Sequence, residues 1–191
     1  MTDRLLQLLN TIVSLTEAEE QAFVGITTTR RLQKKEWLMR HGDICRMVTF
    51  IHSGSLRLFH TVDGEEKTIQ FFFENALYTD YLSFLTEKPT IENVEAMEAC
   101  ELVQFSRVGL EQLYRQHPVF ERIGRISAER AFLSLSARNT LLTNQPPEAR
   151  YQQLIQDRPD LFQRVPQYHI ASFLGIKPES LSRIRKRMAT R

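Results

Sequence analysis

The chain is organised around one stretch near its carboxyl end, Val165–Met188, which reads VPQYHIASFLGIKPESLSRIRKRM. Ile170 and Leu174 lie four residues apart and therefore share one helical face. Gly175 interrupts this pattern, as a tight turn between two helices requires, and Pro178 suits the first turn of a second helix. The stretch therefore predicts two short helices joined by a turn, the arrangement of a helix-turn-helix.

The second predicted helix has two different faces. Leu181, Ile184 and Met188 recur at helical spacing and form its apolar side. The remaining positions are polar or charged, as in a helix that enters a DNA major groove. An ordinary amphipathic hairpin with a solvated basic face would show the same spacing, so the motif alone leaves both interpretations open. The residues expected to contact DNA are Gln167, Glu179, Ser180, Ser182, Arg183, Lys186 and Arg187.

Charge is distributed unevenly along the chain. Residues 146–191 carry nine Lys and Arg against four Asp and Glu, a net charge of +5. The whole chain carries only +2, from 25 basic and 23 acidic residues, so residues 1–145 carry −3. Because phosphate binding needs cations, this concentration of positive charge at the motif favours double-stranded DNA as the partner.

Length and composition indicate an ordinary globular protein. A chain of 191 residues suffices for one substantial core and a small appended domain. Its hydrophobic content of 42% and charged content of 25% are unremarkable, and no apolar run is long enough to cross a bilayer. The start, Met1–Arg4, leads into a helix-like pattern rather than a signal peptide, and only Cys45 and Cys100 carry thiols. We therefore expect a cytoplasmic protein without a membrane partner.

The amino-terminal part of the chain changes from helical to strand patterns. Leu and Ile residues between positions 5 and 13 repeat at helical spacing, and Thr16–Glu19 resembles a capped helix start, so residues 3–24 are predicted to form one or two helices. From about Arg30 onward, short β-type segments alternate with glycine-containing turns. This pattern favours an antiparallel roll or barrel over a parallel sheet. The expected strands span residues 47–52, 55–61, 65–73, 91–97 and 101–105.

Helical spacing returns at residues 107–117 and continues in one long helix, expected from Pro118 to about Asn144. Its apolar side chains are spread too widely for one neighbour to cover: Phe120, Ile123, Ile126, Phe132, Leu133, Leu135 and Leu141. We expect one face to pack on the roll and another on a twin helix, giving a homodimer. The alternative is a long helix buried within one subunit. A linker, Asn144–Pro147, and a short helix over residues 148–156 follow.

This order of elements resembles the Crp–Fnr family of bacterial transcription regulators. The most specific matching segments are FIHSGSLRL at residues 50–58, ACEL at residues 99–102, and the motif at residues 170–187. The resemblance implies an α+β protein whose cyclic-nucleotide-binding-like jelly roll binds a small effector, and it adds RNA polymerase as a further partner. The implied domains are an effector-binding-like roll with flanking helices over residues 1–117, a dimerisation helix and hinge over residues 118–145, and a DNA-binding domain over residues 146–191.

The resemblance also assigns base-reading roles within the motif. Family members often place Arg-Glu near the start of the second helix and an Arg one turn later; the matching positions here are Pro178, Glu179 and Arg183. Glu179 can accept a hydrogen bond from a cytosine amino group, and Arg183 can pair with a guanine edge. Because Pro178 removes one base-reading side chain, we expect a palindromic operator that differs from the best-known one. The family's β-hairpin wing is absent before Arg191, so we expect weaker phosphate binding.

The family's nucleotide site is only partly matched. Relatives hold the phosphate with a Gly-Glu-Leu turn and an Arg-Ser pair, whereas this chain has Thr79-Asp80-Tyr81 and Thr90-Ile91 in those places. An anionic phosphate would lose a guanidinium and meet the Asp80 carboxylate. On the long helix, the polar pair that touches the base is replaced by Leu135-Ser136. We expect this effector pocket (Thr79, Asp80, Tyr81, Thr90, Ile91, Leu135 and Ser136) not to bind cyclic AMP in the family's manner, and to take another small molecule or none.

Other chemistry has little support in the sequence. Two cysteines cannot supply the four thiolates of an iron–sulfur cluster, and His41 and Cys45 flank a Gly-Asp turn rather than forming a metal pair. Trp37 and the Phe71–Phe73 run are better explained as core than as an aromatic ligand cage. Without a nucleophile motif or a phosphate loop, we expect no metal, no cofactor and no catalysis. The main alternative to a regulator is a small-molecule-binding roll whose tail does not bind DNA specifically.

Overall fold

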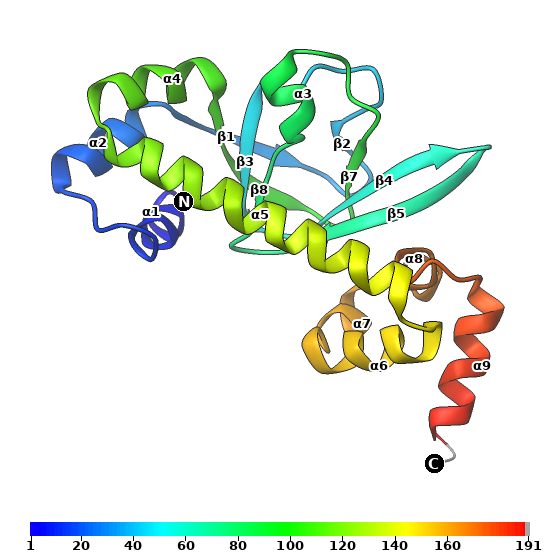
Figure 1. The fold of residues 1–191 in the computed structure, drawn as a ribbon. Coiled ribbons are helices and arrows are strands. Elements are labelled where there is room, and N and C mark those ends of the chain that lie inside the picture. Colours follow the sequence, from blue (N-terminus) through cyan, green and yellow to red (C-terminus); the bar gives the residue numbers. More distant parts are fainter. Residues whose placement is uncertain (190–191) are drawn as a thin grey trace. The chain divides into compact units, whose positions relative to one another are not determined.

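A computed structural model describes residues 1–189, with helices and strands in the order shown in Figure 1. The chain divides into two compact units. The first contains residues 1–59 and 70–129, and the second contains residues 60–69 and the chain from residue 130 onward. Two elements therefore contribute to both units: the hairpin formed by β4 (Leu56–Val62) and β5 (Glu65–Phe72), and the long helix α5 (Val119–Asn144).

Two four-stranded antiparallel sheets form the roll (Figure 1). Phe50 and Val103 lie opposite each other in neighbouring strands of the first sheet and are both fully buried, as the alternation of side chains across a half-buried sheet predicts. The first sheet has the order β1-β8-β3-β6, with β1 at Thr27–Leu32, β8 at Cys100–Ser106, β3 at Met47–Ser53 and β6 at Leu77–Tyr78. The second has the order β2-β7-β4-β5, with β2 at Trp37–Met39 and β7 at Asn93–Ala96.

Helices cover one end of the roll core. The helices of this unit are α1 (Asp3–Asn10), α2 (Glu17–Gly25), α3 (Tyr81–Thr86), α4 (Arg107–Gln116) and the start of α5. Thr16 and Glu19 form the predicted capping box at the start of α2, in which each side chain binds the backbone N–H of the other residue. The apolar faces of α1, α2, α4 and the start of α5 meet the first sheet in one buried cluster: Leu5, Leu9, Phe23, Phe50, Val103, Phe105, Leu113, Phe120 and Ile123.

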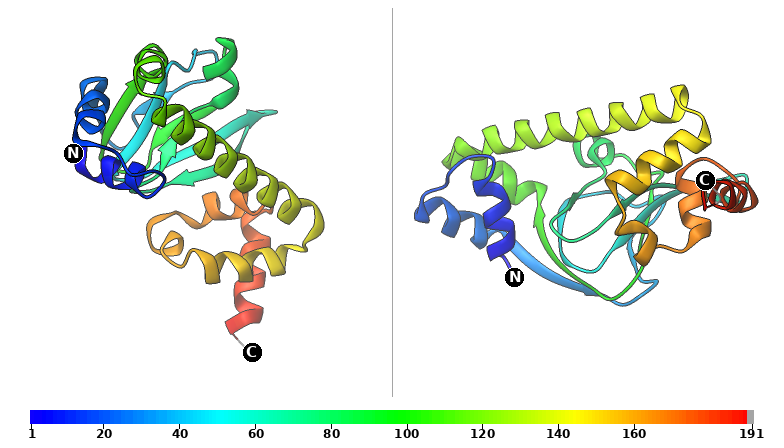
Figure 2. Two further views of the ribbon diagram at one scale, coloured as in Figure 1. Left: turned by 60° about the vertical axis from the view of Figure 1, so that its left-hand side comes forward. Right: turned by 90° about the horizontal axis from the view of Figure 1, so that it is seen from below.

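The second unit contains short helices (Figure 2), and several of their apolar side chains are buried. After α5 come α6 (Pro147–Asp157), α7 (Leu161–Arg164), α8 (Gln167–Phe173) and α9 (Pro178–Ala189). Arg150 is buried and donates from Nη1 to the carbonyl oxygens of Leu142 and Gln145, both at 3.0 Å, so it caps the carboxyl end of α5. Gly175 has a φ of +68° in the turn between α8 and α9, a conformation that favours glycine.

The fold class predicted from the sequence is confirmed: an α+β protein with antiparallel sheets, a long helix and carboxy-terminal helices. Sequence pattern does not indicate β2, α3 or α7, because each is too short to show a repeat. Among the aromatic residues predicted as core, Phe71 and Phe73 are buried, whereas Phe72 and Trp37 are half-buried. No helix within residues 1–189 has the length and hydropathy needed to span a bilayer.

Candidate functional site

Helix α9 is buried on one side and charged on the other. Leu181 and Ile184 are 1% and 4% exposed, and they pack into the core of the second unit. Glu179, Arg183 and Lys186 are exposed, and their spacing of four and three residues places them in one row opposite the buried side. Arg183 donates from Nη2 to the Ser180 hydroxyl at 3.2 Å, which orients the guanidinium along the helix. We call Glu179, Arg183 and Lys186 the outer row of α9.

The other predicted DNA contacts are not all on this outer row. Ser180 and Arg187 lie on the flank of α9 that faces the start of α6, where Arg187 forms an ion pair with Glu148. A groove of about 780 Å³ runs along this flank. It is lined by Pro146, Pro147, Glu148, Ser180, Arg183, Ile184, Lys186 and Arg187. Both side chains of this ion pair are exposed, so the pair is weak and leaves Arg187 able to contact a phosphate.

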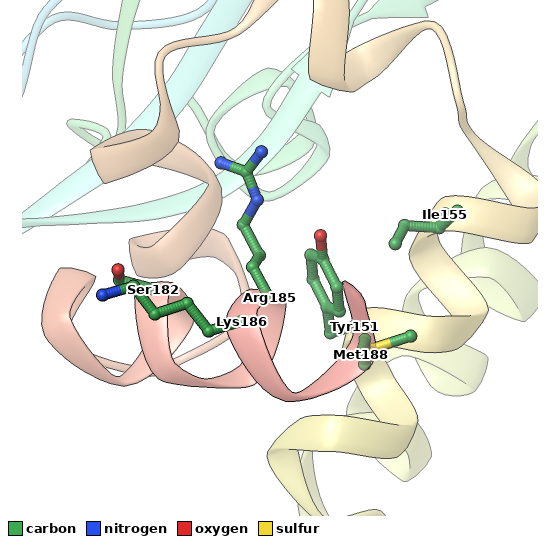
Figure 3. A pocket seen from close by; sticks show the side chains of 6 residues that line it. All are labelled: Tyr151, Ile155, Ser182, Arg185, Lys186 and Met188. Carbon is green, nitrogen blue, oxygen red and sulfur yellow. The ribbon is translucent and has the colours of Figure 1, made fainter. Parts of the chain in front are cut away.

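The opposite flank of α9 carries a cation that the sequence prediction missed. Arg185 is exposed and lines a second groove of about 530 Å³ between α6 and α9, together with Tyr151, Ile155, Ser182, Lys186 and Met188 (Figure 3). In Figure 3 the Arg185 guanidinium and the Tyr151 hydroxyl extend in the same direction, whereas Lys186 extends toward Ser182. The sequence pattern did not clearly indicate that Arg185 is exposed. This residue lies next to Ile184 and four residues after Leu181, at the border of the apolar face.

The first residues of α8 are also exposed. Gln167, the predicted contact in this helix, begins α8 and is accessible, and Tyr168 beside it is 58% exposed. The Tyr168 ring lies against the buried His169, with 4.0 Å between the ring centroids. The start of α8 and the outer row of α9 thus present polar side chains, while Ile170 of α8 and Leu174 directly after it are buried.

In the roll, a second set of predicted residues forms a closed polar cluster. Asp80 precedes α3, and its Oδ1 accepts from the backbone N–H groups of Leu82 and Ser83, both at 3.1 Å. Its Oδ2 accepts from the Thr90 hydroxyl, and both residues are buried, at 8% and 3% exposed. The Thr79 hydroxyl donates to the carbonyl oxygen of Met47 at 3.2 Å. The Asp80 carboxylate therefore caps the start of α3, and it accepts a hydrogen bond from each of these three donors.

The cluster extends to two residues that the sequence prediction missed, Tyr78 and Glu92. The Tyr78 hydroxyl donates to Glu92 Oε2 at 2.8 Å, and the Glu92 backbone N–H donates to the Thr90 hydroxyl at 2.9 Å. Burial raises the pKa of Glu92 to about 7, aided by the nearby Asp80 and opposed by the hydrogen bond from Tyr78. Burial also raises the pKa of Tyr78. These two residues belong to no recognisable sequence motif, because only the folding of the chain brings them together.

The remaining predicted effector residues lie outside this cluster. Tyr81 and Ile91 are 49% and 60% exposed, unlike the buried Asp80 and Thr90. Leu135 and Ser136 are exposed on the part of α5 that belongs to the second unit. The first unit therefore brings together Thr79, Asp80 and Thr90 only. Within the described residues, no group of three or more His, Cys, Asp or Glu is placed to hold a metal ion.

At the place that the family resemblance indicates for a cyclic nucleotide phosphate, the nearby donors are already hydrogen-bonded to Asp80. The backbone N–H groups at the start of α3 donate to the Asp80 carboxylate, and Thr90, in the place of the family's arginine, donates to the same group. A phosphate there would have to displace this carboxylate and would then lie beside its negative charge. Arg107, by contrast, donates to the carbonyl oxygens of Phe84 and Leu85 near the other end of α3.

Comparison with known proteins gives the context of this fold. Residues 29–117 match the family described as Cyclic nucleotide-binding domain. No curated protein matches the sequence. The Thermus thermophilus catabolite activator protein is 20% identical, with a TM-score of 0.60 over 96% of this chain and 87% of that chain.

Two further solved structures are similar over most of their length. The c-di-GMP-responsive global regulator CLP of Xanthomonas campestris is 17% identical, with a TM-score of 0.70 over 92% of each chain. FixK2 from Bradyrhizobium japonicum is 15% identical, with a TM-score of 0.69 over 86% of this chain and 85% of that chain. Residues 29–117 thus match the cyclic nucleotide-binding domain, and the fold, with a long helix and carboxy-terminal helices after that domain, is similar to the folds of these three solved structures.

Proposed function

We propose that the protein is a transcription regulator that binds a palindromic DNA operator as a homodimer, with α8 and α9 as its helix-turn-helix. The observation that carries this proposal is the outer row of α9, in which Glu179, Arg183 and Lys186 are exposed while Leu181 and Ile184 anchor the helix. A helix that is buried on one side and carries polar side chains on its exposed side has the form of a recognition helix. The net charge of +5 at residues 146–191 supports an anionic partner.

The homodimer is supported by the apolar side chains on α5. Phe132, Leu133 and Leu135 are 70%, 66% and 64% exposed, within four consecutive positions of the helix. Large apolar groups concentrated in this way favour burial against a partner. A second α5 offers the same surface, as a two-fold symmetric contact requires. We call Phe132, Leu133 and Leu135 the α5 patch.

The proposal excludes cyclic AMP as an effector bound through its phosphate, because Asp80 holds the donors that the phosphate would need. Isothermal titration calorimetry of the full chain with cyclic AMP should show no binding at micromolar concentrations. Loss of a partly buried arginine–phosphate contact costs about 2–5 kcal/mol, or tens- to thousands-fold in affinity. A micromolar or tighter dissociation constant would contradict this assignment of Asp80 and Thr90.

Selection of bound fragments from random or genomic DNA tests the main proposal. Purified protein should enrich a sequence with two-fold symmetry, because an enriched palindrome needs both the reading helix and the dimer. Protein carrying Arg183→Ala and Glu179→Ala should fail to enrich it. If wild-type protein enriches no sequence while remaining folded, the alternative applies, in which the roll is a small-molecule-binding module without specific DNA binding.

A further inference from the structure

The groove between α6 and α9 that contains Arg185 carries charge of one sign. It has a volume of about 530 Å³, and the described residues that line it include two cations and no acid. All of them belong to the second unit: Tyr151, Ile155, Ser182, Arg185, Lys186 and Met188. We call this hollow the α6–α9 groove.

Apolar side chains form one part of the α6–α9 groove. Ile155 of α6 is 37% exposed, and Met188, in the last turn of α9, is half-buried. Tyr151 is 5% exposed, and its ring packs edge-on against Phe162 with 5.6 Å between the ring centroids, which fixes this wall of the groove. Methionine, by contrast, adapts its shape to different apolar partners. The groove therefore offers one rigid and one adaptable apolar surface.

Arg185 forms the polar edge of the groove. In the view of Figure 3 the Tyr151 ring lies between Arg185 and Ile155, and its hydroxyl extends in the same direction as the Arg185 guanidinium. Within residues 1–189 no carboxylate forms an ion pair with Arg185, whereas Arg187 pairs with Glu148 on the other flank of α9. A guanidinium and a phenol hydroxyl are both donors, so together they suit a carboxylate.

The two parts of the groove favour a polypeptide over DNA as its occupant. A DNA backbone would use the cations but would leave the apolar surface of Ile155 and Met188 uncovered. An amphipathic helix with acidic residues beside its apolar face would cover both parts, and a groove between two helices is a common place for such a helix to bind. The net charge of +5 at residues 146–191 also favours an acidic partner.

We propose that the α6–α9 groove docks an acidic amphipathic helix of a partner protein. A carboxylate of the partner accepts from Arg185 and from the Tyr151 hydroxyl, and an apolar side chain one helical turn away covers Ile155 and Met188. Glu179 and Arg183 of the outer row are not among the residues that line this groove, so docking does not require them. The interaction goes beyond the proposed function and does not depend on DNA binding.

Selection from a library of random peptides displayed on phage tests the chemistry of the occupant. The full chain should enrich peptides that carry Asp or Glu beside large apolar residues at helical spacing. The same selection on Arg185→Glu protein should not enrich this group, because the charge at the groove is reversed. Circular dichroism shows whether the variant is folded. If it is not, Arg185→Gln removes the charge without reversing it and gives the same comparison.

Fluorescence polarisation of a synthetic enriched peptide then places the contact. Arg185→Glu should weaken binding about tenfold or more, and Ile155→Ser about three- to tenfold, through loss of the charge pair and of apolar contact. Arg122→Glu reverses an exposed arginine on the part of α5 in the first unit and should stay within about twofold of wild type. A peptide with Gln in place of its acids should bind wild-type and Arg185→Gln protein equally.

Three outcomes would overturn the proposal. The first is that wild-type protein enriches no peptide, or only peptides without acidic residues. The second is that Arg185→Glu and Arg122→Glu bind the enriched peptide alike, which would place the contact outside the groove. The third is that no peptide is enriched while Arg185→Glu lowers affinity for random-sequence duplex DNA, which would assign the groove to DNA. Failure of the protein to select an operator would contradict the proposed function and leave the peptide result unaffected.

Discussion

In the roll, the polar side chains of Tyr78, Asp80, Thr90 and Glu92 bind one another or nearby backbone groups and are largely buried. On α9, Glu179, Arg183 and Lys186 are exposed along one face of a helix that is buried behind. Polar groups that are mutually satisfied in the interior contribute to stability, whereas exposed ones remain available to a partner. The contrast separates residues whose loss should affect folding from residues whose loss should affect binding. The α5 patch belongs with the second group, although its chemistry is apolar.

The largest effect is expected from the α5 patch. Replacing Phe132 and Leu133 with Glu should give monomers, because two charges would be buried in each copy of the contact. Operator affinity should then fall at least about hundredfold, since the two half-sites would no longer be bound by one linked dimer. Sedimentation and operator titration measure the two effects.

Leu82→Glu is the control for this substitution, because Leu82 is 73% exposed on α3 in the first unit. It introduces the same charge at an exposed leucine outside α5 and should leave the dimer intact. Wild-type protein that sediments as a monomer at micromolar concentration would contradict the proposed role of the α5 patch.

Asp80→Ala should destabilise the folded protein by about 2–3 kcal/mol, because it leaves two backbone N–H groups and the Thr90 hydroxyl without their acceptor. Denaturant unfolding measures the change. Asp160→Ala is the matched control: Asp160 also precedes a helix but makes no capping hydrogen bond, so its loss should cost less than about 0.5 kcal/mol. Equal effects of the two substitutions would show that the Asp80 cluster is not an important source of stability.

Arg183→Ala should leave stability unchanged and should cost about 1–3 kcal/mol of operator affinity per half-site, with relaxed discrimination at one base position. Lys186→Ala, one turn later, should weaken binding to all sequences alike and should lower the slope of log affinity against log salt by about one per half-site. Titrations on operator and scrambled DNA at several salt concentrations distinguish the two roles. An unchanged ratio of specific to non-specific affinity for Arg183→Ala would mean that α9 is not the reading helix.

The sequence was most informative where a pattern extends over many residues. The roll, α5 and the pair α8–α9 follow from strand alternation, from helical spacing and from Gly175, all of which are local signals. At Asp80, a carboxylate in place of the family's phosphate-binding turn predicts a poor fit for a phosphate, and this stays a prediction. The hydrogen bonds that now explain this carboxylate could not be predicted, because Thr90 reaches it from ten residues away.

Contacts between distant segments left no signal of this kind. Residues 60–69 show the pattern of a hairpin, and nothing in them indicates that they pack with the carboxy-terminal helices. Ser172 likewise looks like an ordinary polar residue in a short helix, although it binds the backbone of that hairpin. The ion pair of Arg187 with Glu148 also depends on how α6 meets α9, so it could not be predicted from the sequence.

Glu92 offers the smallest effect and a test of the closed cluster by pH. Its pKa is raised to about 7 in the folded protein, mainly by burial, from a usual value of 4.5. The folded state therefore binds more protons than the unfolded state between these values, and stability should fall as pH rises from about 4.5 to 7. Glu92→Gln keeps an acceptor for Tyr78 without a charge, so it should flatten this dependence and stabilise the protein at pH 8 by about 1–2 kcal/mol after allowance for partial exposure. Glu17→Gln, at an exposed site, should show the same pH dependence of stability as wild type. If Glu92→Gln also shows the wild-type dependence, Glu92 ionises in the folded protein without a cost in stability. The cluster would then be open to water.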